Sequence, residues 1–243
     1  MKRYQAYLQA EWLKQKSISW ILIPLLGPFI IHLLLWIAFA NFGESSFAYS
    51  TFTTSSRGLW GLLIGPFTVF LLVLNSFSLE GNKRTFEYLF SLPDQRVWFV
   101  PVKITLLIAQ LVLHLLAYLL SWSLALGLLA DADTPSLLTL FPSQFMAALT
   151  SFLSFAALIT LQFTLSLLLP KALHALGVGL LGIVIGYLFI NTQKLEFWIY
   201  TLPLYNLQND PPFLYSFIIP LMTIVLLIFA GIQKTRRIEE YEV

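Results

Sequence analysis

The side chains that could carry out acid–base or metal chemistry are three histidines, His32, His114 and His174, in a chain without cysteine. Each falls in or near a different long apolar run. This pattern favours packed or interfacial histidines, with a metal site as the alternative. The short motifs of serine hydrolases, zinc proteases and P-loop ATPases are absent. We therefore expect no cofactor in this chain and no ATP bound in a P-loop of its own.

Three amides also interrupt the apolar runs: Asn75, Gln110 and Gln162. At membrane depth an amide either hydrogen-bonds a neighbouring helix or lines a polar pathway. Charges are nearly absent from the runs, since Glu80 and Lys103 stand at their ends, where they can reach the interface. A proton-coupled carrier usually needs an ionisable relay inside the bilayer. Any transport by this chain would therefore take its energy from outside the chain.

The composition indicates the class of protein. The 243 residues are 58% hydrophobic and 11% charged, with a mean hydropathy of +0.80, whereas soluble domains are about 25% charged. The net charge of +2 gives no reason to expect nucleic acid. The first apolar run is long enough to span a bilayer, so we expect no cleavable signal peptide. The chain is predicted to be an integral membrane protein with almost no soluble mass.

The apolar runs predict a single all-α membrane domain over residues 1–243 with six transmembrane helices. The predicted spans cover about residues 18–42, 58–79, 99–129, 140–169, 172–190 and 213–232. Pro24 and Pro28 predict a kink in the first span. The Ser/Thr-rich residues 43–57 are predicted to form a turn-like loop.

Two amphipathic segments are predicted outside the spans. Residues 1–17 combine aromatic side chains with lysines and predict an interfacial helix; an ordinary solvated helix is the alternative. Residues 191–212 are aromatic and broken by prolines. We expect interfacial or re-entrant helices there on the extracytoplasmic side, with protein or water covering their backbone.

Glycines at helical spacing indicate close helix packing. They are Gly61 and Gly65 in the second span, and Gly179, Gly182 and Gly186 in the fifth. The fifth-span face could pack within the chain or form part of a subunit interface.

The distribution of positive charge predicts the orientation. Six spans put both termini on one side, and that side collects twelve of the 14 Lys and Arg residues. Only Arg57 and Lys194 fall on the other side. The positive-inside rule therefore places both termini in the cytoplasm.

A polar stretch, residues 81–96, separates the second and third spans. Asn82 can cap a helix over residues 82–92, and Pro93 can end it. One face of this helix carries Phe86, Leu89 and Phe90. We predict a short amphipathic helix at the membrane surface that receives mechanical work from a partner; the alternative is that the apolar face rests on lipid headgroups.

The order of these features resembles that of type-2 ABC exporter permeases over nearly the whole chain. An opening basic helix with Glu11 and Lys14, a patterned central segment and a broken stretch before the last span carry the resemblance. The central pattern consists of Glu80, Arg84-Thr85, Leu89, Ser91-Leu92-Pro93, Arg96 and Lys103. Arg84-Thr85 stands where Gly-Thr is frequent in the family. The small size looks most like the lantibiotic-immunity and bacitracin-resistance branch.

The resemblance implies a permease without enzyme activity of its own. Two such chains, identical or related, would pair with two cytoplasmic ATPase subunits that bind ATP and Mg. Residues 82–92 are similar to the coupling helix that docks in an ATPase groove. The docking residues would be Lys83, Arg84, Thr85, Phe86, Glu87, Leu89, Phe90, Pro93 and Arg96.

The implied mechanism is alternating access that exports an amphiphilic peptide, drug or lipid-like substrate across the cell membrane. His32 and Asn75 are the candidates for the substrate pathway. Two alternatives stay open: a self-sufficient secondary transporter or membrane enzyme, and a non-transporting assembly or sensor subunit.

Overall fold

The computed structural model describes residues 2–14, 18–41, 49–78, 93–129, 136–169, 172–190, 199–208, 218–225 and 227–228. Within these ranges the chain is helical apart from short turns, and it contains no strand. The helices are α1 (Lys2–Lys14), α2 (Ser19–Asn41), α3 (Tyr49–Leu59), the π-helix η1 (Trp60–Ile64), α4 (Gly65–Ser78), α6 (Pro93–Leu129), α7 (Leu137–Leu168), α8 (Ala172–Ile190) and α9 (Leu202–Gln208).

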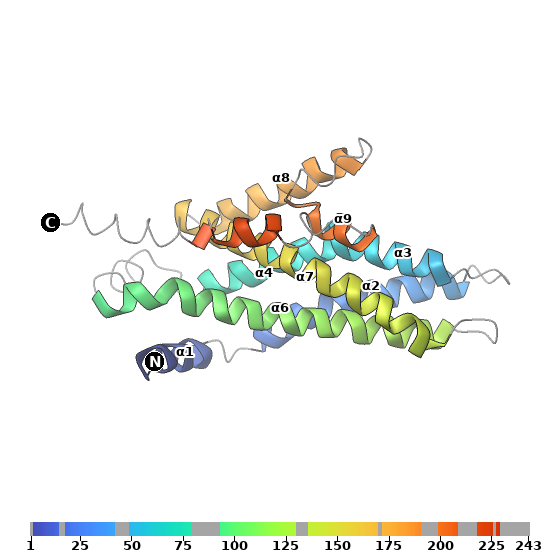
Figure 1. Ribbon diagram of the computed structural model, residues 1–243, viewed down its shortest axis with the longest axis horizontal. Helices are drawn as coiled ribbons and strands as arrows, with labels where there is room; N and C mark the ends of the chain where they lie inside the picture. The colour runs from blue at the N-terminus through green and yellow to red at the C-terminus, as the bar shows by residue number, and fades with distance from the viewer. Residues whose placement is uncertain are drawn as a thin grey trace.

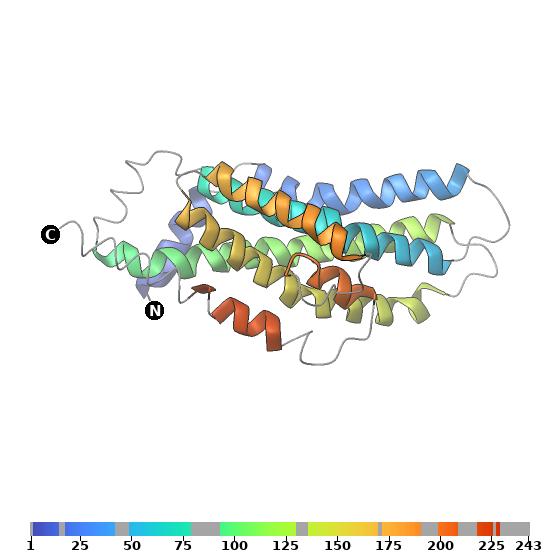
Figure 2. The ribbon, with the colours of Figure 1, turned by 90° about the horizontal axis from the view of Figure 1, so that it is seen from above.

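The long helices lie side by side in an elongated bundle (Figures 1 and 2). The helix α1 packs against α6 at one end of this bundle, where α4 ends and α6 begins. At the opposite end α2 finishes, α3 begins and α6 finishes (Figure 1). We call these the α1 end and the α3 end.

Four helical stretches are long and apolar enough to cross a membrane: Ser19–Ala40, Ser50–Phe77, Trp98–Leu129 and Leu137–Leu168. They correspond to the first four predicted spans. The fifth predicted span coincides with α8, whose apolar part, Leu173–Leu188, is shorter. Half of the sixth predicted span lies outside the described residues, and residues 219–225 within it are helical. Four candidate spans are therefore established, and the count of six stays a prediction.

The predicted loop over residues 43–57 is wrong from Tyr49 onward, because α3 begins there and continues through η1 into α4. The physical reason is the buried face of α3. Phe52, Thr53 and Ser56 are all buried, and the Ser56 hydroxyl hydrogen-bonds inside the bundle. A Ser/Thr-rich sequence reads as a loop when water is assumed to satisfy its hydroxyls, but other helices satisfy Ser56.

The π-helix η1 ends at a point of close packing between helices. Pro66 has no N–H for the ordinary i→i−4 bond, and the Gly65 N–H bonds to the Trp60 carbonyl five residues back. A Cβ on Gly65 would lie 2.4 Å from ring atoms of Phe155 on α7 and 2.7 Å from the Trp60 carbonyl oxygen. Only glycine therefore fits between the π-turn and α7.

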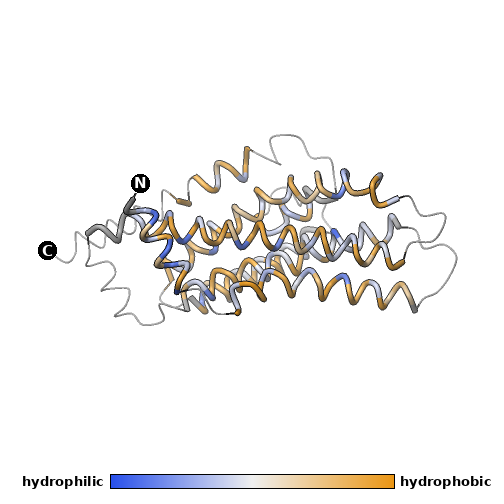
Figure 3. The backbone as a smooth tube through the Cα atoms, turned by 90° about the horizontal axis from the view of Figure 1, so that it is seen from below, coloured by the Kyte–Doolittle hydropathy of each residue, from blue (hydrophilic) through white to orange (hydrophobic). Residues whose placement is uncertain are grey.

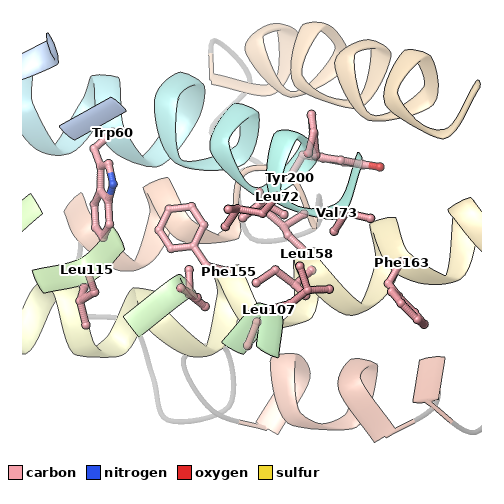
Figure 4. Close-up of a cluster of buried hydrophobic side chains, with 14 of the residues drawn as sticks. Trp60, Leu72, Val73, Leu107, Leu115, Phe155, Leu158, Phe163 and Tyr200 are labelled. Atoms are coloured by element: carbon pink, nitrogen blue, oxygen red, sulfur yellow. The ribbon is translucent and has the colours of Figure 1, made fainter. Parts of the chain in front are cut away.

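The main hydrophobic core surrounds this point and extends along α4, α6 and α7 (Figure 4). It includes Trp60, Leu72, Leu107, Phe155 and Phe163. A second cluster at the α3 end contains Leu35, Phe52, Trp122, Leu126 and Leu140. Exposed leucines and isoleucines cover the outer faces of α2 and α8. Figure 3 shows that hydrophobic residues predominate along the long helices. This outer surface suits contact with lipid.

Two of the three predicted packing glycines of α8 lie against side chains of the same chain. A Cβ on Gly179 would lie 2.9 Å from Phe70 and from Gln162 Oε1, and a Cβ on Gly182 would lie 2.4 Å from Tyr200. Gly61 and Gly186 are also buried.

Of the predicted re-entrant segment, residues 191–212, the structure describes 199–208. The short helix α9 packs against α7, α3 and η1 (Figure 1). Tyr200, Leu202 and Leu204 are buried, and the Ser151 hydroxyl donates to the Pro203 carbonyl over 3.2 Å. Other helices therefore cover this stretch of backbone.

Candidate functional site

The predicted docking residues fall in two groups. Residues 79–92 lie outside the described part of the chain; they include Lys83, Arg84, Thr85, Phe86, Glu87, Leu89 and Phe90. Pro93 is the first residue of α6, a position where its missing N–H is not needed, and Arg96 lies in the first turn of that helix.

The two candidate pathway residues lie far apart. His32 is 1% exposed on α2, where it contacts Ser56 of α3, and Asn75 is half-buried on α4. At about 1.5 Å per helical residue, Ser56 and Asn75 are about 28 Å apart along the axis. The structure therefore does not bring His32 and Asn75 together.

His32 is the first member of a buried polar network. Its Nε2 lies 2.7 Å from Ser56 Oγ. Its Nδ1 lies 2.7 Å from Ser121 Oγ on α6 and 2.9 Å from the Pro28 carbonyl oxygen. Both ring nitrogens of His32 are thus used within the chain.

The network continues from α3 to α7. Ser56 Oγ lies 3.2 Å from the Tyr118 hydroxyl of α6, and Gln144 Nε2 of α7 donates to that hydroxyl over 2.7 Å. Arg57 Nε donates to Gln144 Oε1 over 2.8 Å. Arg57, predicted in a loop, therefore lies in a candidate span, bound to a buried amide.

One assignment of protons gives each hydroxyl and the imidazole N–H in this network an acceptor. Tyr118 accepts from Gln144 and donates to Ser56, and Ser56 donates to His32 Nε2. The proton of His32 is then on Nδ1, which faces the Pro28 carbonyl and the Ser121 hydroxyl. The Ser121 hydroxyl in turn donates to a backbone carbonyl of α6. In this assignment His32 is a neutral imidazole that joins α2 to α3 and α6.

His114 compensates for a missing backbone hydrogen bond in α2. Pro28 has no N–H, so the Pro24 carbonyl four residues earlier lacks its usual donor. His114 Nδ1 on α6 lies 2.8 Å from that carbonyl oxygen. The Trp60 indole, which can only donate, reaches His114 Nε2 over 2.9 Å. The proton of His114 must then be on Nδ1, and the imidazole satisfies both neighbours.

The His32 network and the contacts of His114 meet at a stacked pair of rings. Trp60 and Tyr118 are parallel, with centroids 3.8 Å apart. Together the contacts link α2, α3, η1, α6 and α7. His174, by contrast, is exposed on α8, and no group of three metal-binding side chains occurs among the described residues. The arrangement is suited to holding helices in register, because the nitrogens of His32 and His114 are already occupied.

Sequence reasoning missed most of this network. Ser56, Tyr118, Ser121 and Gln144 are ordinary residues whose pairing depends on helices distant in sequence. A helical period through residues 49–59 was the available signal, because Phe52, Thr53 and Ser56 fall on one face. Of the three amides that interrupt the apolar runs, Gln110 and Gln162 are buried, and their Oε1 atoms have no hydrogen-bond partner among the described residues.

Tyr118→Phe is expected to lower the free energy of unfolding by about 1–2 kcal/mol, because it leaves a buried Gln144 N–H without its acceptor. Thermal unfolding in detergent would measure this loss. Gln144→Leu should lower the free energy of unfolding less in the Tyr118→Phe background than in the wild-type chain. Strictly additive losses would contradict the hydrogen bond between these two side chains.

A second polar cluster lies at the α1 end. Lys103 Nζ of α6 is 2.8 Å from Glu11 Oε2 of α1 and 3.1 Å from the Ser76 carbonyl oxygen of α4. Lys14 also pairs with Glu11. Lys103 was expected to reach the interface, but its side chain is only 2% exposed, because Glu11 and the end of α4 cover it.

This pairing controls the ionisation of Glu11. Burial alone would raise the pKa of Glu11, but the positive charge of Lys103, aided by Lys14, outweighs burial and holds the pKa below its ordinary value. A lowered folded-state pKa means that the pair stabilises the fold at neutral pH. That contribution is lost as the pH falls through the lowered pKa.

Comparison with known proteins agrees with the bundle and with the composition. The family model for ABC-2 family transporter proteins matches residues 7–186, which include most of α1, the four candidate spans and most of α8. No curated protein sequence matches the chain. Because the family model covers most of the 243 residues, the chain belongs to the ABC-2 family of transporter proteins.

Proposed function

We propose that this chain is the membrane subunit of an ATP-driven exporter, in which a separate ATPase binds ATP and Mg and drives export of an amphiphilic substrate. Membership of the ABC-2 family makes the chain a membrane permease component of an ABC transporter. That match, which extends through the central polar stretch, is the observation that carries the proposal.

The proposed docking site for the ATPase is the helix predicted over residues 82–92. It connects α4, which ends at Ser78, with α6, which begins at Pro93, at the α1 end of the bundle. A short helix joined directly to two spans can pass a push from its partner to both. Phe86, Leu89 and Phe90 would enter an apolar groove, and Lys83, Arg84 and Glu87 would set register at its rim.

The proposed assembly has two permease chains and two ATPases, with six spans per chain and the α1 end in the cytoplasm. The apolar interior favours an amphiphilic peptide, drug or lipid-like substrate, as in the lantibiotic-immunity and bacitracin-resistance branch, over a small ion. His32 can line a pathway only in a conformation that opens its hydrogen bonds to Ser56 and Ser121.

The test is co-purification. A C-terminal tag on the chain is expected to bring down a stoichiometric ABC ATPase from native membranes in mild detergent. Leu89→Asp or Phe86→Asp should abolish this association, because a charge in an apolar groove is desolvated without a partner.

Tyr88→Asp is the matched control. At 100° per residue Tyr88 lies about 150° from the apolar stripe, so this aromatic-to-aspartate change should leave the ATPase bound. A chain that purifies alone and transports in its absence would favour the self-sufficient carrier. An ATPase that stays bound to Leu89→Asp would move the docking site elsewhere.

A further inference from the structure

Three helices converge on one buried ammonium group at the α1 end. Besides the Ser76 carbonyl and Glu11, Lys103 Nζ lies 5.8 Å from the centre of the Phe99 ring. In the proposed function α4 and α6 receive the push from the ATPase, and α1 has no role. The contacts of Lys103 indicate a role for α1.

The contact with Ser76 joins the two helices that flank the predicted docking segment. Ser76 belongs to the last turn of α4, whose carbonyls have no donor within the helix. Lys103 supplies a donor and a positive charge at this helix C-terminus, where both are favourable. The end of α4 is thereby attached to α6.

The contact with Glu11 adds α1 to the same unit. The Lys103 side chain is 2% exposed and the Glu11 side chain 12%. A buried charge that loses its partner costs far more than a surface pair does. Separating α1 from α6 would leave Lys103 without its carboxylate, so the pair resists that separation.

A second contact fixes the other part of α1. The Tyr4 hydroxyl lies 2.8 Å from Thr105 Oγ1, which donates its own proton to the Pro101 carbonyl and so accepts from Tyr4. The Tyr4 ring also meets Trp98 edge-on, with centroids 5.6 Å apart. Tyr4 and Glu11 stand about two turns apart on α1, and two anchors of that spacing fix the direction of the helix as well as its position.

We propose that Glu11 and Lys103 are positioning residues that make α1, the end of α4 and the start of α6 move as one body when the ATPase acts on residues 82–92. This inference rests on the proposed function. Since α2 begins at Ser19, shortly after α1, the pair would carry the motion into α2 as well. Without it, α1 would keep its Tyr4 contacts with α6, but a push on the docking segment would reach α1 less directly than it reaches α4 and α6.

The first test measures the attachment itself. The chain has no cysteine, so Gln9→Cys on α1 and Leu120→Cys on α6 provide the only labelling sites; both positions are exposed. Spin labels there, in full-length chain in lipid nanodiscs, should give one narrow distance distribution. Glu11→Gln is expected to broaden it at least twofold, whereas Glu11→Asp, which keeps the carboxylate, should broaden it less.

The second test measures coupling in the complex with the ATPase. Glu11→Gln should keep the ATPase bound at full stoichiometry but reduce, about tenfold, the stimulation of ATP turnover by the permease. Glu11→Asp, which keeps the carboxylate, should keep most of it. Lys14→Gln, which removes an exposed partner of the same carboxylate, should change neither readout.

These outcomes separate the two proposals. If the wild-type chain holds no ATPase, the proposed function fails, and the label distances still report whether the pair fixes α1. If the ATPase binds but Glu11→Gln changes neither the distance distribution nor the turnover, the inference about the pair is overturned.

Discussion

Gly65→Ala is expected to destabilise the protein by at least about 2 kcal/mol, although adding one methyl group inside a helix usually helps. In an ordinary helix this change stabilises by about 1 kcal/mol. Here the new Cβ would lie 2.4 Å from Phe155 and 2.7 Å from the Trp60 carbonyl oxygen. Overpacking of this kind costs about 1–3 kcal/mol or more, and the Trp60 oxygen belongs to backbone, which cannot rotate away.

Gly177→Ala on α8 is the matched control, because no atom lies within 4 Å of the position that its new methyl group would take. The melting temperatures of the two variants, followed by size-exclusion chromatography after heating in detergent, should move in opposite directions from that of the wild type. Equal shifts would mean that α7 can move away from η1, contrary to the packing described here.

His114→Leu is expected to lower the free energy of unfolding by about 2–4 kcal/mol. It leaves two buried groups unsatisfied, the Trp60 indole N–H and the Pro24 carbonyl. Each such group costs about 1–3 kcal/mol, and the lower part of that range suits a membrane bundle. Equilibrium unfolding in mixed detergent would measure the loss.

The control for this prediction changes Pro28, the residue that leaves the Pro24 carbonyl without its backbone donor. Pro28→Ala restores an N–H that can donate to the Pro24 carbonyl, so in the His114→Leu background it should recover about 1 kcal/mol or more. In the wild-type background the same carbonyl already has His114 as its donor, so Pro28→Ala should raise the free energy of unfolding by less. Identical gains in both backgrounds would argue against the role assigned to His114.

The class of protein and the course of most of its helices could be predicted from the amino-acid sequence. A stretch of about 20 apolar residues is helical in a membrane whatever surrounds it, since its backbone has no other source of hydrogen bonds. The predicted spans at 18–42, 99–129 and 140–169 therefore match α2, α6 and α7 closely. The order of the motifs was also enough to predict the ABC-2 family, whose model matches most of the chain.

The partners of the polar side chains, by contrast, became visible only in the folded bundle. Residues 49–57 looked like a loop because the sequence does not show that His32 will accept a hydrogen bond from Ser56. Lys103 looked like a residue that reaches the interface because its carboxylate, Glu11, is distant in the chain. Apolar burial depends on the average character of a segment and can be read locally, whereas a hydrogen bond or ion pair depends on which single atom the fold brings within about 3 Å.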